Sequence, residues 1–90
     1  MWDLKVEDLL SSRGRVKVLK VLLNEGQANI TRIVRESGLN HRLVEKHLEE
    51  LVKMGIVQER RYGRLRMFMV DLRDPKVSGL SEVLRQLESL

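Results

Sequence analysis

Four arginines lie close together in the C-terminal half of the chain, and their side chains could bind phosphate groups. They are Arg60, Arg61, Arg64 and Arg66. Residues 56–70, which contain all four, hold Glu59 as their only acidic residue, so this segment carries most of the chain's formal net charge of +4. Each phosphate contact releases counterions and favours binding to a polyanion. On charge alone, a solvated basic hairpin without a ligand fits the pattern equally well.

The residues that usually carry catalytic or metal chemistry are scarce. The chain has no cysteine, which excludes a disulfide, a thiolate nucleophile and a cysteine zinc site. His41 and His47 are six residues apart, so on one helix they point to different faces, and we expect His47 to be packed and hydrogen-bonded between helices. So small a fold could assemble no Ser-His-acid or paired-carboxylate set into a cleft, and the chain has no glycine-rich phosphate loop. We therefore expect no enzyme activity, no metal and no cofactor.

Length and composition bound the class of protein. A chain of 90 residues has room for one hydrophobic core, and its 42% apolar and 33% charged content is typical of a folded domain. No apolar run approaches the roughly 18 residues that a membrane span needs, and the first residues lack the order of a signal peptide. We expect a cytoplasmic protein. The excess of 11 arginines over 6 lysines indicates a thermophilic source.

Apolar spacing and capping residues predict four helices in the first 54 residues. A short helix near the N-terminus is followed by a longer one from about Ser12 to Asn24, which ends at Gly26. Asn29 caps a two-turn helix that ends at Gly38, and Asn40 caps a helix from His41 to Met54. The last two helices, joined by a tight glycine-containing turn, form a helix-turn-helix over about residues 29–54.

A basic hairpin is predicted directly after the helix-turn-helix. Residues 56–61 and 65–70 are extended runs, and they are separated by Tyr62, Gly63 and Arg64. Glycine at the tip permits the positive φ angle that a hairpin turn requires. Such a hairpin in this position is a wing, spanning about residues 56–70.

The order of these elements resembles that of winged helix-turn-helix transcription regulators, most closely the ArsR-like group. The matching pieces are "RVKVLKVLL", "ITRIVRESGLNHRLVEKHLEELVKMGIV" and "RRYGR". The resemblance implies that a homodimer binds double-stranded DNA, with the helix that begins at Asn40 or His41 in the major groove. The wing would then lie on the backbone or in the minor groove. Metal-sensing members use cysteines or clustered histidine and acidic ligands, so the absence of cysteine means that metal sensing is not implied.

Helix geometry selects the side chains that would meet DNA. On the helix from His41, the face opposite the buried stripe carries His41, Arg42, Glu45, Lys46 and Glu49. N-terminal residues of a recognition helix reach base edges, so we expect Arg42 to contact guanine and His41 and Lys46 to contact bases or phosphates. Asn40 could add a phosphate contact to its role as a cap. Glu45 could accept from cytosine or pair with a basic neighbour.

The wing would supply contacts that carry affinity. We expect Arg60, Arg61, Arg64 and Arg66 to contact phosphates or enter the minor groove. Tyr62 either hydrogen-bonds a phosphate or caps the hairpin. The three aromatic residues, Trp2, Tyr62 and Phe68, are too few for the stacking platform of a single-strand binder, which favours duplex as the substrate.

A last helix is predicted over about residues 75–90, because Asp74 can cap it and Pro75 suits its first position. Its apolar stripe consists of Val77, Leu80, Val83, Leu84, Leu87 and Leu90. We expect that so small a domain cannot bury this stripe without a partner. The helix either folds back on the wing or pairs with its mate across a two-fold axis, and we favour a dimer interface that also includes Trp2 and Leu9.

Together these features predict one domain over residues 1–90, mainly α with a small β-hairpin wing (α+β). The function predicted is that of a homodimeric regulator that binds specific double-stranded DNA sites. The alternative is a protein-interaction module that docks a larger complex through its hydrophobic C-terminal helix, with the basic wing incidental. Neither reading involves a membrane.

Overall fold

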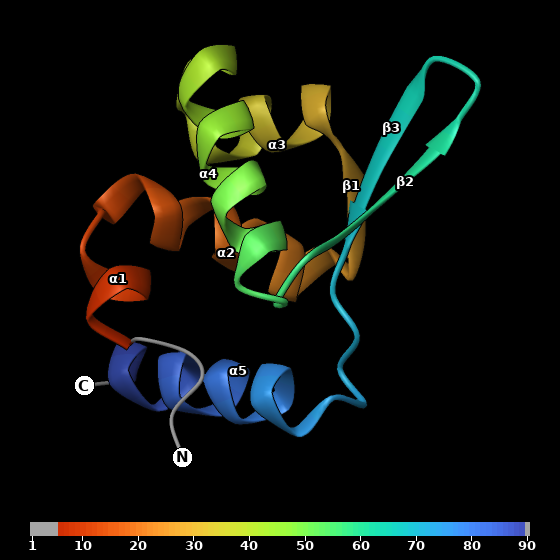
Figure 1. Ribbon diagram of the computed structural model, residues 1–90. Coiled ribbons are helices and arrows are strands. Elements are labelled where there is room, and N and C mark those ends of the chain that lie inside the picture. The colour runs from red at the N-terminus through yellow and green to blue at the C-terminus, as the bar shows by residue number, and fades with distance from the viewer. Residues whose placement is uncertain (1–5, 90) are drawn as a thin grey trace.

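The computed structural model describes residues 6–89, and these form five helices and one small sheet (Figure 1). The elements in chain order are α1 (Val6–Leu10), α2 (Arg13–Glu25), β1 (Gln27–Asn29), α3 (Ile30–Ser37), α4 (His41–Lys53), β2 (Gln58–Tyr62), β3 (Leu65–Met69) and α5 (Pro75–Glu88). The predicted class, mainly α with a small β wing, is confirmed. Within this part of the chain, no helix combines the length and apolar character needed to cross a bilayer.

Side-chain caps define where the helices begin. The Asn29 side chain accepts a hydrogen bond from the Arg32 amide at 2.8 Å, and the Asn40 side chain accepts one from the Leu43 amide at 2.9 Å. Ser12 and Asp74 cap α2 and α5 in the same way. Because each cap satisfies an amide that has no partner within its helix, these local signals fix the predicted starts.

The sheet has three antiparallel strands in the order β1-β3-β2. The predicted hairpin corresponds to β2 and β3, whereas no strand was predicted at β1. Its three residues are too few to show an alternating pattern, and β1 exists because Ala28 pairs with Phe68 on β3. Asn29 therefore ends a strand and also caps α3.

The core lies between α2, α3, α4 and one face of the sheet. Phe68 and Ala28, paired across the sheet, are 1% and 3% exposed and face the helices. The fully buried aliphatic side chains include Val18, Leu19, Leu22, Ile33, Val44, Leu48 and Leu51. Leu65 is exposed, and Met67 and Met69 are half-buried on the opposite face of the sheet.

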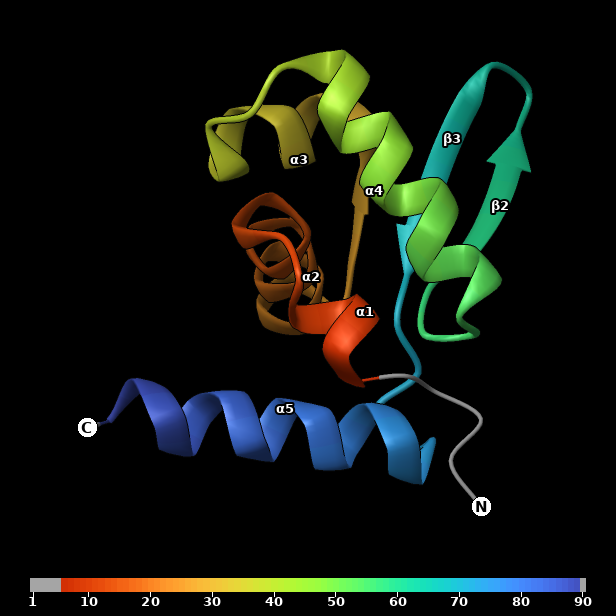
Figure 2. The same cartoon turned by 60° about the vertical axis from the view of Figure 1, so that its left-hand side comes forward.

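The C-terminal helix α5 lies below α1 and α2 and away from the wing (Figures 1 and 2). Val77 is 1% exposed, and Leu80 and Leu84 pack against the core. The prediction that this stripe can be buried only with a partner is therefore wrong for its inner residues, since the domain's own helices bury them. The fold-back on the wing is also wrong, because α5 rests against α2 instead, with Lys20 paired to Glu88 at 2.6 Å.

Two polar side chains lie buried where α2 meets α4. Arg15 is 7% exposed, donates to the Asp8 carbonyl and forms an ion pair with Glu50. His47 is 7% exposed and lies against Gly14, so close that a Cβ at position 14 would stand 2.8 Å from the His47 Nε2 atom. Glycine at position 14 therefore permits the close approach of the two helices.

Two helical glycines should respond to alanine in opposite directions. Gly14→Ala should lower the free energy of unfolding by about 1–3 kcal/mol, because the new methyl group overlaps the buried His47 ring. Gly79→Ala is the matched control: it meets nothing within 4 Å, so removing helix-interior glycine should raise that free energy by about 0.5–1 kcal/mol. Urea unfolding followed by circular dichroism measures both. A stabilising Gly14→Ala would show that α2 and α4 are not in close contact there.

Candidate nucleic-acid interface

Helix α4 presents a polar face to solvent because its opposite face is fixed in the core. Val44, Leu48 and Leu51 are 0% exposed. The outward residues line a shallow depression on α4 and are His41, Arg42, Glu45, Lys46 and Glu49. Among them Arg42 and Lys46 are exposed and have no ion pair within residues 6–89. The predicted outer face of this helix is thus present, and it offers two free cations.

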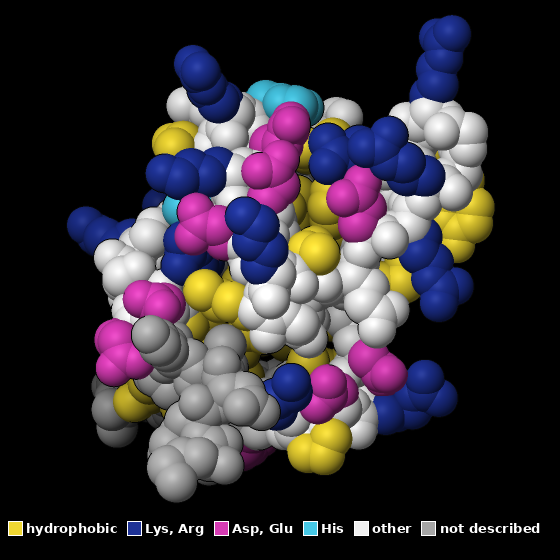
Figure 3. Space-filling model, in the orientation of Figure 1, with side chains coloured by type: hydrophobic (Ala, Val, Ile, Leu, Met, Phe, Trp, Pro, Cys, Tyr) yellow, Lys and Arg dark blue, Asp and Glu magenta, His cyan; other side chains and the backbone are white. Residues whose placement is uncertain are grey.

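The wing extends beside α4 and ends in a tight turn. Gly63 at its tip has a φ angle of 62°, which a side chain would strain. The exposed side chains around the tip are Arg60, Arg61, Tyr62 and Arg64. Figure 3 shows Lys and Arg side chains on the wing and over α4, with acidic side chains between them. These cations therefore gather on the side of the domain formed by the two elements.

One predicted wing arginine behaves differently from the others. Arg66 donates from Nε to Glu59 Oε2 at 2.8 Å and from Nη2 to Glu59 Oε1 at 3.4 Å, and its Nη1 lies 3.8 Å from Glu45 Oε1. Its guanidinium carbon stands 5.3 Å from the centre of the Phe68 ring. The side chain is 22% exposed. Arg66 is therefore occupied by contacts inside the domain.

The same two carboxylates have further partners. Glu59 Oε2 lies 3.3 Å from Arg61 Nε, and Glu45 Oε2 lies 3.5 Å from His41 Nδ1. The hydrogen bond from Arg66 holds the pKa of Glu59 below its usual range, and the Glu59 hydrogen bond raises the pKa of Arg66. We call His41, Glu45, Glu59, Arg61 and Arg66 the interface charge cluster. It was not predicted, because it depends on how the wing lies against α4.

His47 lies on α4 but belongs to the core. Its burial was predicted, but the predicted hydrogen bond is wrong for Nδ1, which is buried and has no hydrogen-bond partner within residues 6–89. Burial lowers the pKa of His47 below its usual value of 6.5, and the nearby positive charge of Arg15 acts in the same direction. The neutral form of this histidine is therefore the one that fits the folded protein.

The residues predicted for the dimer interface are in different environments. Leu9 and Val77 are buried within the chain itself, and Leu80 and Leu84 are partly buried. Val83 and Leu87 on α5 are 53% and 55% exposed. Trp2 and Leu90 lie outside the described residues.

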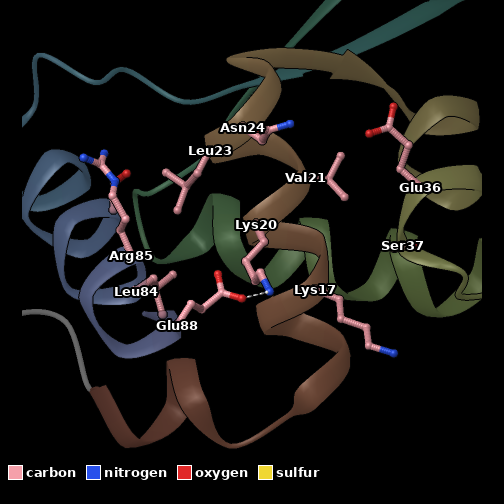
Figure 4. A pocket seen from close by; sticks show the side chains of 11 residues that line it. Lys17, Lys20, Val21, Leu23, Asn24, Glu36, Ser37, Leu84, Arg85 and Glu88 are labelled. Carbon is pink, nitrogen blue, oxygen red and sulfur yellow. Dashed lines mark hydrogen bonds and ion pairs between the residues drawn. The ribbon is translucent and has the colours of Figure 1, made fainter. Parts of the chain in front are cut away.

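A second hollow lies between α2 and α5 on another part of the surface (Figure 4). Val21, Leu23 and Leu84 contribute apolar side chains to it, and the Lys20–Glu88 ion pair joins the two helices. Its rim carries both cations and carboxylates, and Lys17 and Glu36 are among them. Within residues 6–89, no group of three or more histidine and acidic side chains is arranged to hold a metal ion.

The comparisons with known proteins agree on one class. Residues 13–73 match the family model described as "Sugar-specific transcriptional regulator TrmB". No curated protein matches the chain in sequence.

Three solved structures share the fold at low sequence identity. The AntR antimony-specific transcriptional repressor matches with a TM-score of 0.78 at 22% identity, over 91% of this chain and 72% of that chain. The repressor BigR from Xylella fastidiosa matches with a TM-score of 0.75 at 21% identity, over 89% of this chain and 79% of that chain. The third is a homodimeric winged helix-turn-helix DNA-binding domain from Mycobacterium bovis, described as a possible ArsR-family transcriptional regulator. It matches with a TM-score of 0.73 at 21% identity, over 93% of this chain and 75% of that chain.

The buried histidine predicts a pH dependence of stability. The folded state binds fewer protons at His47 than the unfolded chain, so the stability that the neutral ring contributes is present above pH 6.5 and is lost as the pH falls through the lower pKa of the folded state. His47→Gln should show a smaller fall in the free energy of unfolding between neutral and mildly acidic pH. His41→Gln, which leaves His47 in place, should keep the wild-type dependence. Denaturant titrations across this pH range provide the measurement, and equal curves for wild type and His47→Gln would contradict the assignment.

Proposed function

The chain belongs to the TrmB family of transcriptional regulators, and from this premise we propose that it regulates transcription by binding double-stranded DNA as a homodimer. The observation that supports the proposal most directly is the arrangement of exposed cations on α4 and on the adjacent wing. Helix α4 is the second helix of the helix-turn-helix and has its outer face free, and the wing follows it directly in the chain. A duplex that lies across this side can meet the helix in its major groove and the wing on its backbone.

In this proposal the contacts on α4 carry the sequence preference. Arg42 is exposed in the first turn of the helix, where two of its N–H donors can pair with the O6 and N7 acceptors of guanine. His41 and Lys46 contact bases or phosphates. Asn40 caps the helix and lies at the phosphate backbone. Glu45 takes the alternative role of pairing with basic neighbours, His41 and Arg66, and reads no base.

The wing contributes affinity that does not depend on sequence. Arg60, Arg61 and Arg64 contact phosphates or enter the minor groove, and Tyr62 hydrogen-bonds a phosphate. Arg64 lies in the turn itself and has no ion pair within residues 6–89. Arg60 is likewise exposed without an ion pair in this part of the chain, so Arg60 and Arg64 are the wing side chains that are most free to bind a phosphate.

The homodimer is proposed to form through α5. Val83 and Leu87 are exposed apolar residues on one helix, and α1, whose Leu10 is 47% exposed, lies next to α5 in both views (Figures 1 and 2). Pairing across a two-fold axis would cover these side chains, and two copies of α4 about one helical turn of DNA apart, roughly 34 Å, could then engage two half-sites together. The homodimeric Mycobacterium bovis domain supports such an assembly. Two linked half-sites raise affinity through effective concentration.

Salt dependence of duplex binding tests the DNA contacts. Arg64→Ala should lower the slope of log affinity against log salt by about one unit per subunit, because one phosphate contact is lost. Arg73→Ala removes the same charge from an exposed side chain ahead of α5 and should leave the slope unchanged. Fluorescence anisotropy with random-sequence duplexes measures both. Absence of binding by the wild type at low salt would reject the proposal and favour a protein-docking module.

The α5 interface is tested by placing charges on it. Val83→Glu with Leu87→Glu should yield a folded monomer, because both side chains are exposed in the single chain and the charges would be buried only in the dimer. Leu72→Glu, at another exposed apolar residue, should remain dimeric. Sedimentation at micromolar concentration decides. A monomeric wild type would reject the homodimer, and a dimeric double variant would place the interface elsewhere.

A further inference from the structure

We propose that Arg66 is a positioning residue that governs DNA binding by holding Glu45 of α4 and Glu59 of β2, and that it does not itself contact a phosphate. The inference rests on the proposed function, since it concerns how the wing and α4 act together on a duplex. It separates Arg66 from the other wing arginines. Its consequence is that one side chain couples the wing to α4.

The contacts of Arg66 leave little of its guanidinium group for a ligand. Each of its three nitrogens faces a carboxylate oxygen: Nε and Nη2 face Glu59 and Nη1 faces Glu45, at 2.8, 3.4 and 3.8 Å. Phe68, which is buried, lies against the same group. A phosphate would have to displace ion pairs that are already formed. Arg64, two residues away in the turn, has no such partners within residues 6–89.

The register of the hairpin explains why Arg66 points inward. In the antiparallel register of β2 and β3, Arg66 stands opposite Arg61 and Phe68 stands opposite Glu59. All four side chains therefore belong to the same face of the sheet. That face is turned toward the helices, because Phe68 is in the core. Arg66 is therefore directed at α4 by the strand itself, whatever ligand is present.

Charge explains why an arginine is needed there. Glu45 and Glu49 on α4 and Glu59 on β2 bring three carboxylates to the side where a polyanion is proposed to bind, and all three raise the pKa of Arg66. Without Arg66 these carboxylates would repel one another across the gap between helix and wing, and would repel phosphates. Arg66 offsets part of this negative charge and ties the two elements together. Within residues 6–89, its contact with Glu45 is the ion pair that joins α4 to the wing.

The experiment compares Arg66→Met with Arg64→Met, both of which remove one charge and keep an apolar stem. Binding to random-sequence duplexes is measured over a range of salt. Arg66→Met should weaken binding by about fivefold or more without lowering the salt slope, whereas Arg64→Met should lower that slope by about one unit per subunit. Arg66→Lys keeps the charge but cannot reach both carboxylates, so it should also bind more weakly. Full affinity in Arg66→Lys would overturn the proposal, because a phosphate contact tolerates lysine.

Neutralising the two carboxylates tests whether Arg66 acts on DNA binding through them. When Glu45→Gln and Glu59→Gln are added to Arg66→Met, most of the lost DNA affinity should return. When the same two substitutions are added to Arg64→Met, the gain in affinity should be no larger than in the wild type. An equal gain in the Arg66→Met protein and in the wild type would mean that Arg66 acts independently of the carboxylates. That result, or a salt slope reduced by about one unit in Arg66→Met, would overturn the proposal.

A measurement without DNA separates this inference from the proposed function. In the free protein, the amide hydrogens of β2 and β3 should exchange about tenfold faster or more in Arg66→Met and in Arg66→Lys, and at the wild-type rate in Arg64→Met. Unchanged exchange in both Arg66 variants would overturn the positioning role even if the protein binds duplex. If the Arg66 variants exchange faster but the wild-type protein binds no duplex, the proposed function is rejected, and Arg66 remains the side chain that holds the wing.

Discussion

The close contact between α2 and α4 is the constraint on which the rest of the domain depends. Gly14 allows the two helices to approach, and the buried Arg15–Glu50 pair links them beside the His47 ring. Because α4 is held on this side, its other face is free for solvent. Arg15 also holds the carbonyl of Asp8, so the end of α1 is attached to the same contact. A change in the spacing of α2 and α4 would therefore move the polar face of α4, the end of α1 and the position of the wing together.

Much of the fold could be predicted because its signals are local. Asn29, Asn40 and Asp74 each cap a helix through a hydrogen bond to an amide two or three residues away, so neighbouring residues suffice to place the helix starts. The strand β1 and the position of α5 could not be found in this way. Ala28 is in a strand only because residue 68, far along the chain, pairs with it. The apolar stripe on α5 has one helical period, yet Val77 is buried, Leu80 and Leu84 pack against the core, and Val83 and Leu87 stay exposed.

The candidate interface shows the same division. The exposure of Arg42 and Lys46 follows from helical period, since residues opposite a buried stripe must face solvent. The pairing of Arg66 with Glu45 could not be predicted, because it requires the strand register and the distance between wing and helix. A count of basic residues therefore overstates the number of free cations in the wing. The burial of His47 was predicted, but nothing in the sequence around it indicates that its Nδ1 atom has no hydrogen-bond partner within residues 6–89.

Asn29 gives the domain a mechanical property. It pairs with Met67 on β3, and its side chain caps α3. The wing is therefore continuous through hydrogen bonds with the start of the helix-turn-helix, and a push on the wing tip is carried along β3 into β1 and α3. Such a body resists deformation when it binds. If a duplex lies across α4 and the wing, the DNA must supply the bending that makes both contacts possible, and sequences with flexible base steps are favoured at base pairs that no side chain touches.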